Sequence, residues 1–158
     1  MTNLFGFNLV LAVGSCALLG GFTLGNLLAG FLVGFATLSL TGPIFGHAGY
    51  FGKMLRVARL GLYFVGELTF SSLQVAWDVV TPGHKSRPAI VAIPLDITEP
   101  TQIAVLANLI SLTPGSLSLD VSPDQRTLYV HGMFVDDPGE FRDRIKSGFE
   151  RKVREAME

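Results

Sequence analysis

The chain has 158 residues, of which 12 are Lys or Arg and 13 are Asp or Glu, and its charged fraction of 16% lies below the roughly 25% of an average soluble domain. The charges are also unevenly placed, because Met1–Gly52 carries none and residues 80–158 carry 20 of the 25. This distribution excludes a uniform soluble globule, a disordered chain and a basic nucleic-acid-binding protein, and it predicts a membrane segment followed by a small water-soluble tail.

The uncharged N-terminal run is too long for a single membrane crossing. As one helix it would span roughly 78 Å at about 1.5 Å per residue, whereas the hydrocarbon core is about 30 Å thick. The segment Gly20-Gly21-Phe22-Thr23 offers a flexible turn, so the pattern predicts helices near 4–19 and 24–40 that form a short hairpin. Gly30 and Gly34 lie one turn apart on the second helix, where small side chains let another helix approach closely.

A third apolar segment follows a cluster of cations. Residues 50–59 mix apolar side chains with Lys53, Arg56 and Arg59, which is typical of a segment lying at the membrane interface. Residues 60–80 are long enough for a third transmembrane helix, and Pro82-Gly83 is expected to end it.

One face of this predicted third span is polar. Five side chains follow one another at spacings of three or four residues, which places them on one side of a helix: Tyr63, Glu67, Ser71, Gln74 and Asp78. A charge in mid-membrane costs about 2.5–3.5 kcal/mol, so we expect the stripe to face protein or water. Two interpretations stay open: Glu67 takes part in a proton or cation path, or the stripe binds the helix to neighbouring subunits through hydrogen bonds.

From Arg87 onward the pattern becomes that of a small α+β domain with the order βαββα. The expected strands are 89–97, 116–121 and 127–133, the first helix is 99–110, and a final helix begins after Asp136. Apolar residues recur every fourth position in that final helix and predict its buried stripe: Phe141, Ile145, Phe149, Val153 and Met157. We therefore divide the chain into a membrane domain, 1–83, and a soluble domain, 84–158.

The second strand of this domain and the turn before it have distinct patterns. Leu117, Leu119 and Val121 alternate with polar residues, as in a half-buried strand. Thr113-Pro114-Gly115 has Pro and Gly where a type II turn needs them. Asn108 lies on the preceding, otherwise apolar helix, and we expect it to be buried and to hold this turn in place.

The sequence contains no recognisable enzyme site. It lacks a nucleophile elbow and a Gly-rich phosphate loop, and its three histidines are scattered. We therefore expect no catalytic residues, no cofactor and no metal site.

Three segments of the tail resemble the E subunit of the Mrp (also called Mnh) multisubunit cation/proton antiporters. They are Ile93-Pro94-Leu95-Asp96, the run LANLISLTPGSL over 106–117, and Thr127-Leu-Tyr-Val-His131. The resemblance extends to the apolar hairpin and to Glu67-Leu68 in the third span. The family usually has Thr where this chain has Ser111 and Ser116, and both substitutions keep a hydroxyl group.

The resemblance implies a small accessory subunit of a hetero-oligomer in the bacterial plasma membrane that exchanges Na⁺, or another monovalent cation, for H⁺. Its partners would be the other antiporter subunits and membrane lipids, with no nucleic acid. The family signature maps onto Asn108, Thr113, Pro114 and Gly115, and the family's third-span acid maps onto Glu67.

The resemblance also implies a multi-pass protein whose C-terminal domain is cytoplasmic, although the charges do not fix this orientation. Lys53, Arg56 and Arg59 flank one end of the third span, and Lys85 and Arg87 flank the other, so the positive-inside rule is nearly balanced. With three full spans the first group would lie outside, against the rule. The alternative function is a stand-alone membrane anchor whose tail recruits a soluble partner.

Overall fold

The computed structural model describes residues 4–41, 50–83 and 86–158. It consists of helices and a three-stranded antiparallel sheet, as expected for a helical N-terminal part and an α+β C-terminal part. The chain divides into two compact units, Met1–Leu55 and Arg56–Glu158. The boundary expected at residue 83 separates a part predicted to lie in the membrane from a part predicted to lie in water. The two compact units are defined by packing instead, so that boundary stays a prediction.

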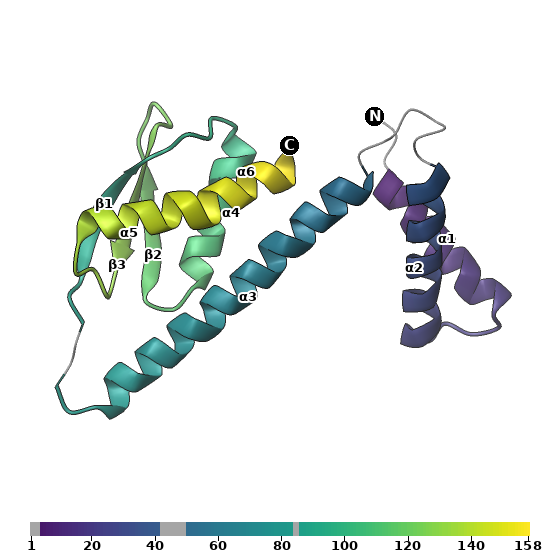
Figure 1. Cartoon of the computed structure of the whole chain (residues 1–158), viewed down its shortest axis with the longest axis horizontal. Coiled ribbons are helices and arrows are strands. Elements are labelled where there is room, and N and C mark those ends of the chain that lie inside the picture. Colours follow the sequence, from purple (N-terminus) through teal and green to yellow (C-terminus); the bar gives the residue numbers. More distant parts are fainter. Residues whose placement is uncertain (1–3, 42–49, 84–85) are drawn as a thin grey trace. The chain divides into compact units, whose positions relative to one another are not determined.

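The first unit contains the helical hairpin that the sequence predicts. Helix α1 covers Leu4–Leu18 and α2 covers Leu24–Thr41, joined by a short turn (Figure 1). Gly20 takes a positive φ of 76° in this turn, a conformation that glycine adopts without a Cβ penalty. The Asn26 backbone N–H donates to Thr23 Oγ1 at 3.2 Å, so Thr23 caps the start of α2.

The two helices meet at the glycines singled out by the sequence. Gly30 and Gly34 are both buried, and a Cβ added at Gly30 would lie 3.1 Å from the Ala12 Cα atom. Gly34 lies in the same way against Asn8 of α1. The spacing therefore serves packing between α1 and α2 of the same chain.

We predict that Gly30→Val destabilises the hairpin by about 1–3 kcal/mol, because the added side chain forces α2 away from α1. Gly14→Val is the matched control, since a Cβ at Gly14 would meet no described atom within 4 Å. Thermal unfolding of the two full-length variants in detergent measures the difference. Equal melting temperatures for both variants would contradict the packing role of Gly30.

Helix α3 covers Tyr50–Val80 as one helix of 31 residues. It joins the expected interfacial segment, 50–59, and the expected third span, 60–80, without a break. Among the described residues, only α2 is both long and apolar enough to cross a membrane; α1 is apolar but has 15 residues.

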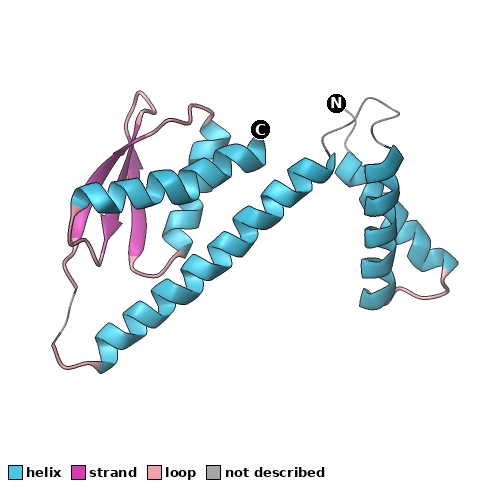
Figure 2. Cartoon of the chain, viewed as in Figure 1, coloured by secondary structure: helices cyan, strands magenta, loops and turns pink. Residues whose placement is uncertain are grey.

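The C-terminal domain has two layers, a sheet and a set of helices (Figure 2). Its strands are β1 (Ala89–Pro94), β2 (Ser116–Val121) and β3 (Thr127–Gly132), in the antiparallel order β1-β3-β2. Helix α4 covers Pro100–Leu112, and a continuous C-terminal helix consists of α5 (Pro138–Ile145), a π-helical turn η2 (Lys146–Glu150) and α6 (Arg151–Met157). The buried sheet face meets both helices through Val91, Ile93, Leu128 and Val130.

Strand β2 differs from its expected orientation. Leu117 and Leu119 are 49% and 48% exposed, so the leucines lie on the open face of the sheet. Ser118 takes an inward position instead: its Oγ donates to the Ala107 carbonyl at 3.0 Å, and its backbone N–H donates to Ser111 Oγ at 3.1 Å. After a register shift between Ser118 and Asp120, Val121 packs against the core as expected. The alternation of apolar and polar residues does not show which face of a strand is buried, because a serine can occupy the buried face when it hydrogen-bonds to the backbone of a neighbouring helix.

The π-helical turn explains the four-residue repeat of the last helix. In an α-helix each residue turns about 100°, so a four-residue spacing drifts by about 40° per step. One π turn holds an extra residue and cancels most of this drift. Phe141, Ile145, Phe149 and Val153 are consequently all buried in one core, as the sequence predicts, and Met157 packs against that core.

Candidate functional site: the interface between α3 and the C-terminal domain

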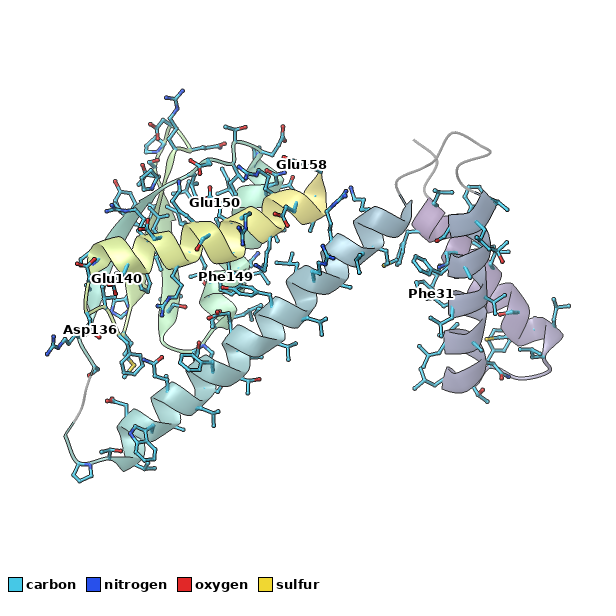
Figure 3. The ribbon with its side chains drawn as sticks, viewed as in Figure 1. Phe31, Asp136, Glu140, Phe149, Glu150 and Glu158 are labelled. Carbon is cyan, nitrogen blue, oxygen red and sulfur yellow. The ribbon has the colours of Figure 1, made fainter. Side chains whose placement is uncertain are left out.

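The polar stripe of α3 lies against the C-terminal domain of the same chain. Leu60, Tyr63 and Phe64 pack on its hydrophobic core. The Tyr63 ring meets the Phe149 ring edge-on, with centroids 5.2 Å apart, and Phe149 points from the C-terminal helix toward α3 (Figure 3). The predicted polar face thus meets protein, and that protein is this chain's own tail.

Tyr63 is the centre of this contact. Lys152 Nζ lies 4.2 Å from the centroid of its ring, within the range of a cation–π interaction. Gly148 lets the C-terminal helix approach Tyr63 closely, since a Cβ there would lie 3.1 Å from Tyr63 Cζ and closer still to the hydroxyl. The Tyr63 hydroxyl donates a hydrogen bond to the Glu67 carboxylate one turn along α3.

Two groups of residues that the sequence singles out come together at one cavity. Four members of the stripe line it, and so does the turn that follows α4; the lining includes Tyr63, Glu67, Ser71, Gln74, Thr113, Pro114 and Gly115. The cavity holds ≈ 60 Å³, enough for a few water molecules and much less than the roughly 300–1,000 Å³ of a small-molecule site.

The turn itself has the predicted type II geometry. Gly115 has a φ of 84°, and the Ser116 backbone N–H donates to the Thr113 carbonyl at 3.2 Å. The Thr113 hydroxyl donates to the Leu109 carbonyl at 2.7 Å, and the Ser116 hydroxyl donates to the Ile110 carbonyl at 2.8 Å. These hydroxyls satisfy the carbonyls at the end of α4.

The remaining predicted residues lie elsewhere. Asn108 is exposed on α4, so the expectation that it is buried and holds the turn is wrong. The side-chain hydrogen bonds that tie the turn to α4 come from Thr113 and Ser116. Asp78 is only 5% exposed and lines a second cavity of ≈ 160 Å³ with Gln74 and Phe134. Gly30 and Gly34 belong to the hairpin.

Glu150 is a functional candidate that sequence reasoning missed. It is 2% exposed, although most of the charged residues around it in the C-terminal helix are only partly buried or exposed. Its Oε1 atom accepts from the backbone N–H groups of Asp96 and Ile97, at 2.6 and 3.2 Å. Lys146 Nζ lies 2.9 Å from Asp96 Oδ1 and 3.8 Å from Glu150 Oε2. This network fastens the loop between β1 and α4 to the π-helical turn.

The arrangement is suited to holding elements together rather than to chemistry. The cavity beside Glu67 is small, and the Thr113 and Ser116 hydroxyls in its lining donate hydrogen bonds to carbonyls of α4. Over the residues that the structure describes, no group of three or more His, Cys, Asp or Glu side chains could hold a metal ion.

Comparison with known proteins assigns this architecture to a family. A family model described as "Na+/H+ ion antiporter subunit" matches residues 8–156. The E1 subunit of the Na(+)/H(+) antiporter of Staphylococcus haemolyticus (strain JCSC1435) is 34% identical over 151 residues, covering 96% of this chain and 95% of that protein. The chain belongs to the family of Na⁺/H⁺ antiporter E subunits.

One further relative agrees with this assignment to the E-subunit family, and one solved structure shares the fold. The E subunit of the Na(+)/H(+) antiporter of Bacillus subtilis (strain 168) is 30% identical over 128 residues, covering 81% of each chain. A chain in the structure of the membrane-bound sulfane sulfur reductase, an archaeal respiratory membrane complex, superposes with a TM-score of 0.58 at 24% identity over 98% of both chains. That likeness shows a shared fold. As a member of the E-subunit family, the chain is part of a transporter rather than an enzyme.

Proposed function

We propose that this chain is an accessory subunit that stabilises a multisubunit Na⁺/H⁺ antiporter and does not itself conduct the ions. The family match over residues 8–156 carries the proposal. The packing supports it, because Glu67 faces the chain's own domain and Tyr63 donates a hydrogen bond to it. Its partners are the other subunits of the antiporter, and Na⁺ and H⁺ pass through the assembled complex.

The membrane part of this proposal is a hairpin in the plasma membrane of a bacterium. Helix α2 is apolar over 18 residues and 63–66% exposed at Leu32 and Val33, which suits a lipid or protein environment of low polarity. We place the C-terminal domain in the cytoplasm. The sequence predicts α3 as a third span; we infer a different placement for α3 below.

Affinity purification of the tagged full-length chain in mild detergent tests the proposed function. We expect several very hydrophobic antiporter subunits to co-purify, giving a particle far heavier than 17.0 kDa. A stand-alone anchor would instead retain a soluble partner without those membrane proteins, which would contradict the proposal.

Glu67→Gln separates a structural role of this residue from an ion path. The amide still accepts the Tyr63 hydrogen bond, so we expect both complex abundance and Na⁺/H⁺ antiport to change by less than about twofold, in line with the small effect of a substitution that keeps its hydrogen bond. Antiport in inverted vesicles and the yield of purified complex are the two measurements. Antiport that disappears while the complex stays intact would place Glu67 on an ion path.

A further inference from the structure

Helix α3 has one covered face and one uncovered face. The covered face is the polar stripe, which packs on the C-terminal domain from Leu60 to Asp78. The opposite face is apolar and open, with Leu62 75%, Leu73 66% and Val80 73% exposed. An amphipathic helix whose polar side is already occupied by its own domain leaves a long apolar surface for another partner.

The length of the covered face argues against a crossing. From Leu60 to Asp78 the helix advances roughly 27 Å, at about 1.5 Å per residue, which nearly equals the 30 Å or so of the hydrocarbon core. If α3 crossed the bilayer in this conformation, the domain beside it would enter the hydrocarbon as well. That domain carries Arg87 and Asp136, whose side chains are 74% and 82% exposed, and burying such groups in lipid is unfavourable.

The distribution of positive charges along the chain agrees with an α3 that stays on one side of the membrane. If α3 crossed, Lys53, Arg56 and Arg59 would lie on the side opposite Lys85 and Arg87. If only the α1–α2 hairpin enters the membrane, all five cations lie on the same side. The turn between α1 and α2 contains no Lys or Arg. The positive-inside rule then places all five, and the C-terminal domain with them, in the cytoplasm.

We infer that α3 lies along the cytoplasmic surface of an anionic lipid bilayer, with its apolar face in the boundary between headgroups and acyl chains and the C-terminal domain on its other side. The inference rests on the proposed membrane hairpin. Three features support lipid as the partner: the apolar face runs the length of the helix, cations occur at its start, and the hairpin precedes it by only eight residues. A chain of that length spans at most about 30 Å, so α3 begins near the membrane.

The single tryptophan of the chain makes this placement measurable. Trp77 is replaced by Phe, and one tryptophan is then introduced in full-length protein by Leu62→Trp, Leu73→Trp or Val80→Trp. These positions are exposed, so the new side chains do not disturb the domain core. The variants are reconstituted in phosphatidylcholine–phosphatidylglycerol vesicles containing lipids brominated at known acyl depths, and quenching gives the depth of each tryptophan.

Two control variants in the same Trp77→Phe background define the limits of the measurement. Leu32→Trp on α2 reports the hairpin, and Ile90→Trp on the open face of the sheet reports a position 64% exposed on the domain. We expect strong quenching for Leu32→Trp and little quenching for Ile90→Trp.

For the three α3 variants we expect similar, shallow depths of about 5–10 Å, as for an interfacial helix. Depths that change progressively by up to roughly 27 Å between residues 62 and 80 would overturn the inference and establish a third span. If the three α3 variants are not quenched while Leu32→Trp is, the inference is also overturned. The apolar face of α3 would then bind a protein rather than lipid. If Leu32→Trp is unquenched as well, the membrane hairpin itself fails.

Discussion

Replacing Glu150 with alanine is expected to destabilise the C-terminal unit by about 2–4 kcal/mol. The substitution removes the acceptor of two backbone N–H groups, that of Ile97, which is buried, and that of Asp96, which is partly buried, and an unsatisfied buried donor costs about 1–3 kcal/mol. It also takes one carboxylate away from Lys146. Denaturant unfolding of the full chain in detergent, followed by circular dichroism, measures the loss.

Two variants show whether hydrogen bonding or charge carries this effect. Glu150→Gln keeps an oxygen for the two N–H groups and should lose only about 1 kcal/mol. Glu155→Ala removes an exposed acid whose Oε1 atom lies 3.9 Å from Arg151 Nε, and it should change stability by less than about 1 kcal/mol. Hydrogen exchange at the Asp96 and Ile97 amides should accelerate in Glu150→Ala alone. Equal stability of Glu150→Ala and Glu155→Ala would show that the buried network contributes nothing.

The regular elements follow from the sequence because their signals are local. The uncharged run, the glycine turn and the alternating strands predict α1, α2 and β3, and the Pro-Gly pair predicts the turn at Gly115. The stripe of α3 is also predicted, since spacings of three and four place Tyr63 and Glu67 on one face of any helix.

The surroundings of those elements depend on tertiary contacts that periodicity does not contain. The stripe indicates a face that needs a partner, but it does not show that the chain's own tail supplies one. Glu150 has the sequence context of a solvated acid, and it is buried only because the loop after β1 brings two N–H groups to it. Leu117 and Leu119 look like core residues, yet Ser118 between them hydrogen-bonds to α4 and the leucines lie outward.

The close contact between Gly148 and Tyr63 predicts that the effect of Gly148→Ala on stability changes sign when the Tyr63 side chain is removed. Gly148→Ala should destabilise the C-terminal unit by about 1–3 kcal/mol, because the new Cβ would lie 3.1 Å from Tyr63 Cζ and still closer to its hydroxyl. Alanine is otherwise favoured over glycine within a helix by about 0.5–1 kcal/mol. In a Tyr63→Ala background the clash is absent, so the same substitution should become stabilising.

Gly66→Ala is the matched control, since a Cβ at Gly66 on α3 would meet no described atom within 4 Å, and it should stabilise by about 0.5–1 kcal/mol. Thermal unfolding of the four variants of the cycle and this control gives the coupling energy. A Gly148→Ala variant as stable as Gly66→Ala would mean that Tyr63 moves aside freely. A sign reversal in the Tyr63→Ala background would instead show that packing between α3 and the C-terminal helix holds the Tyr63 ring in place against Gly148, so that it cannot move aside for the new methyl group.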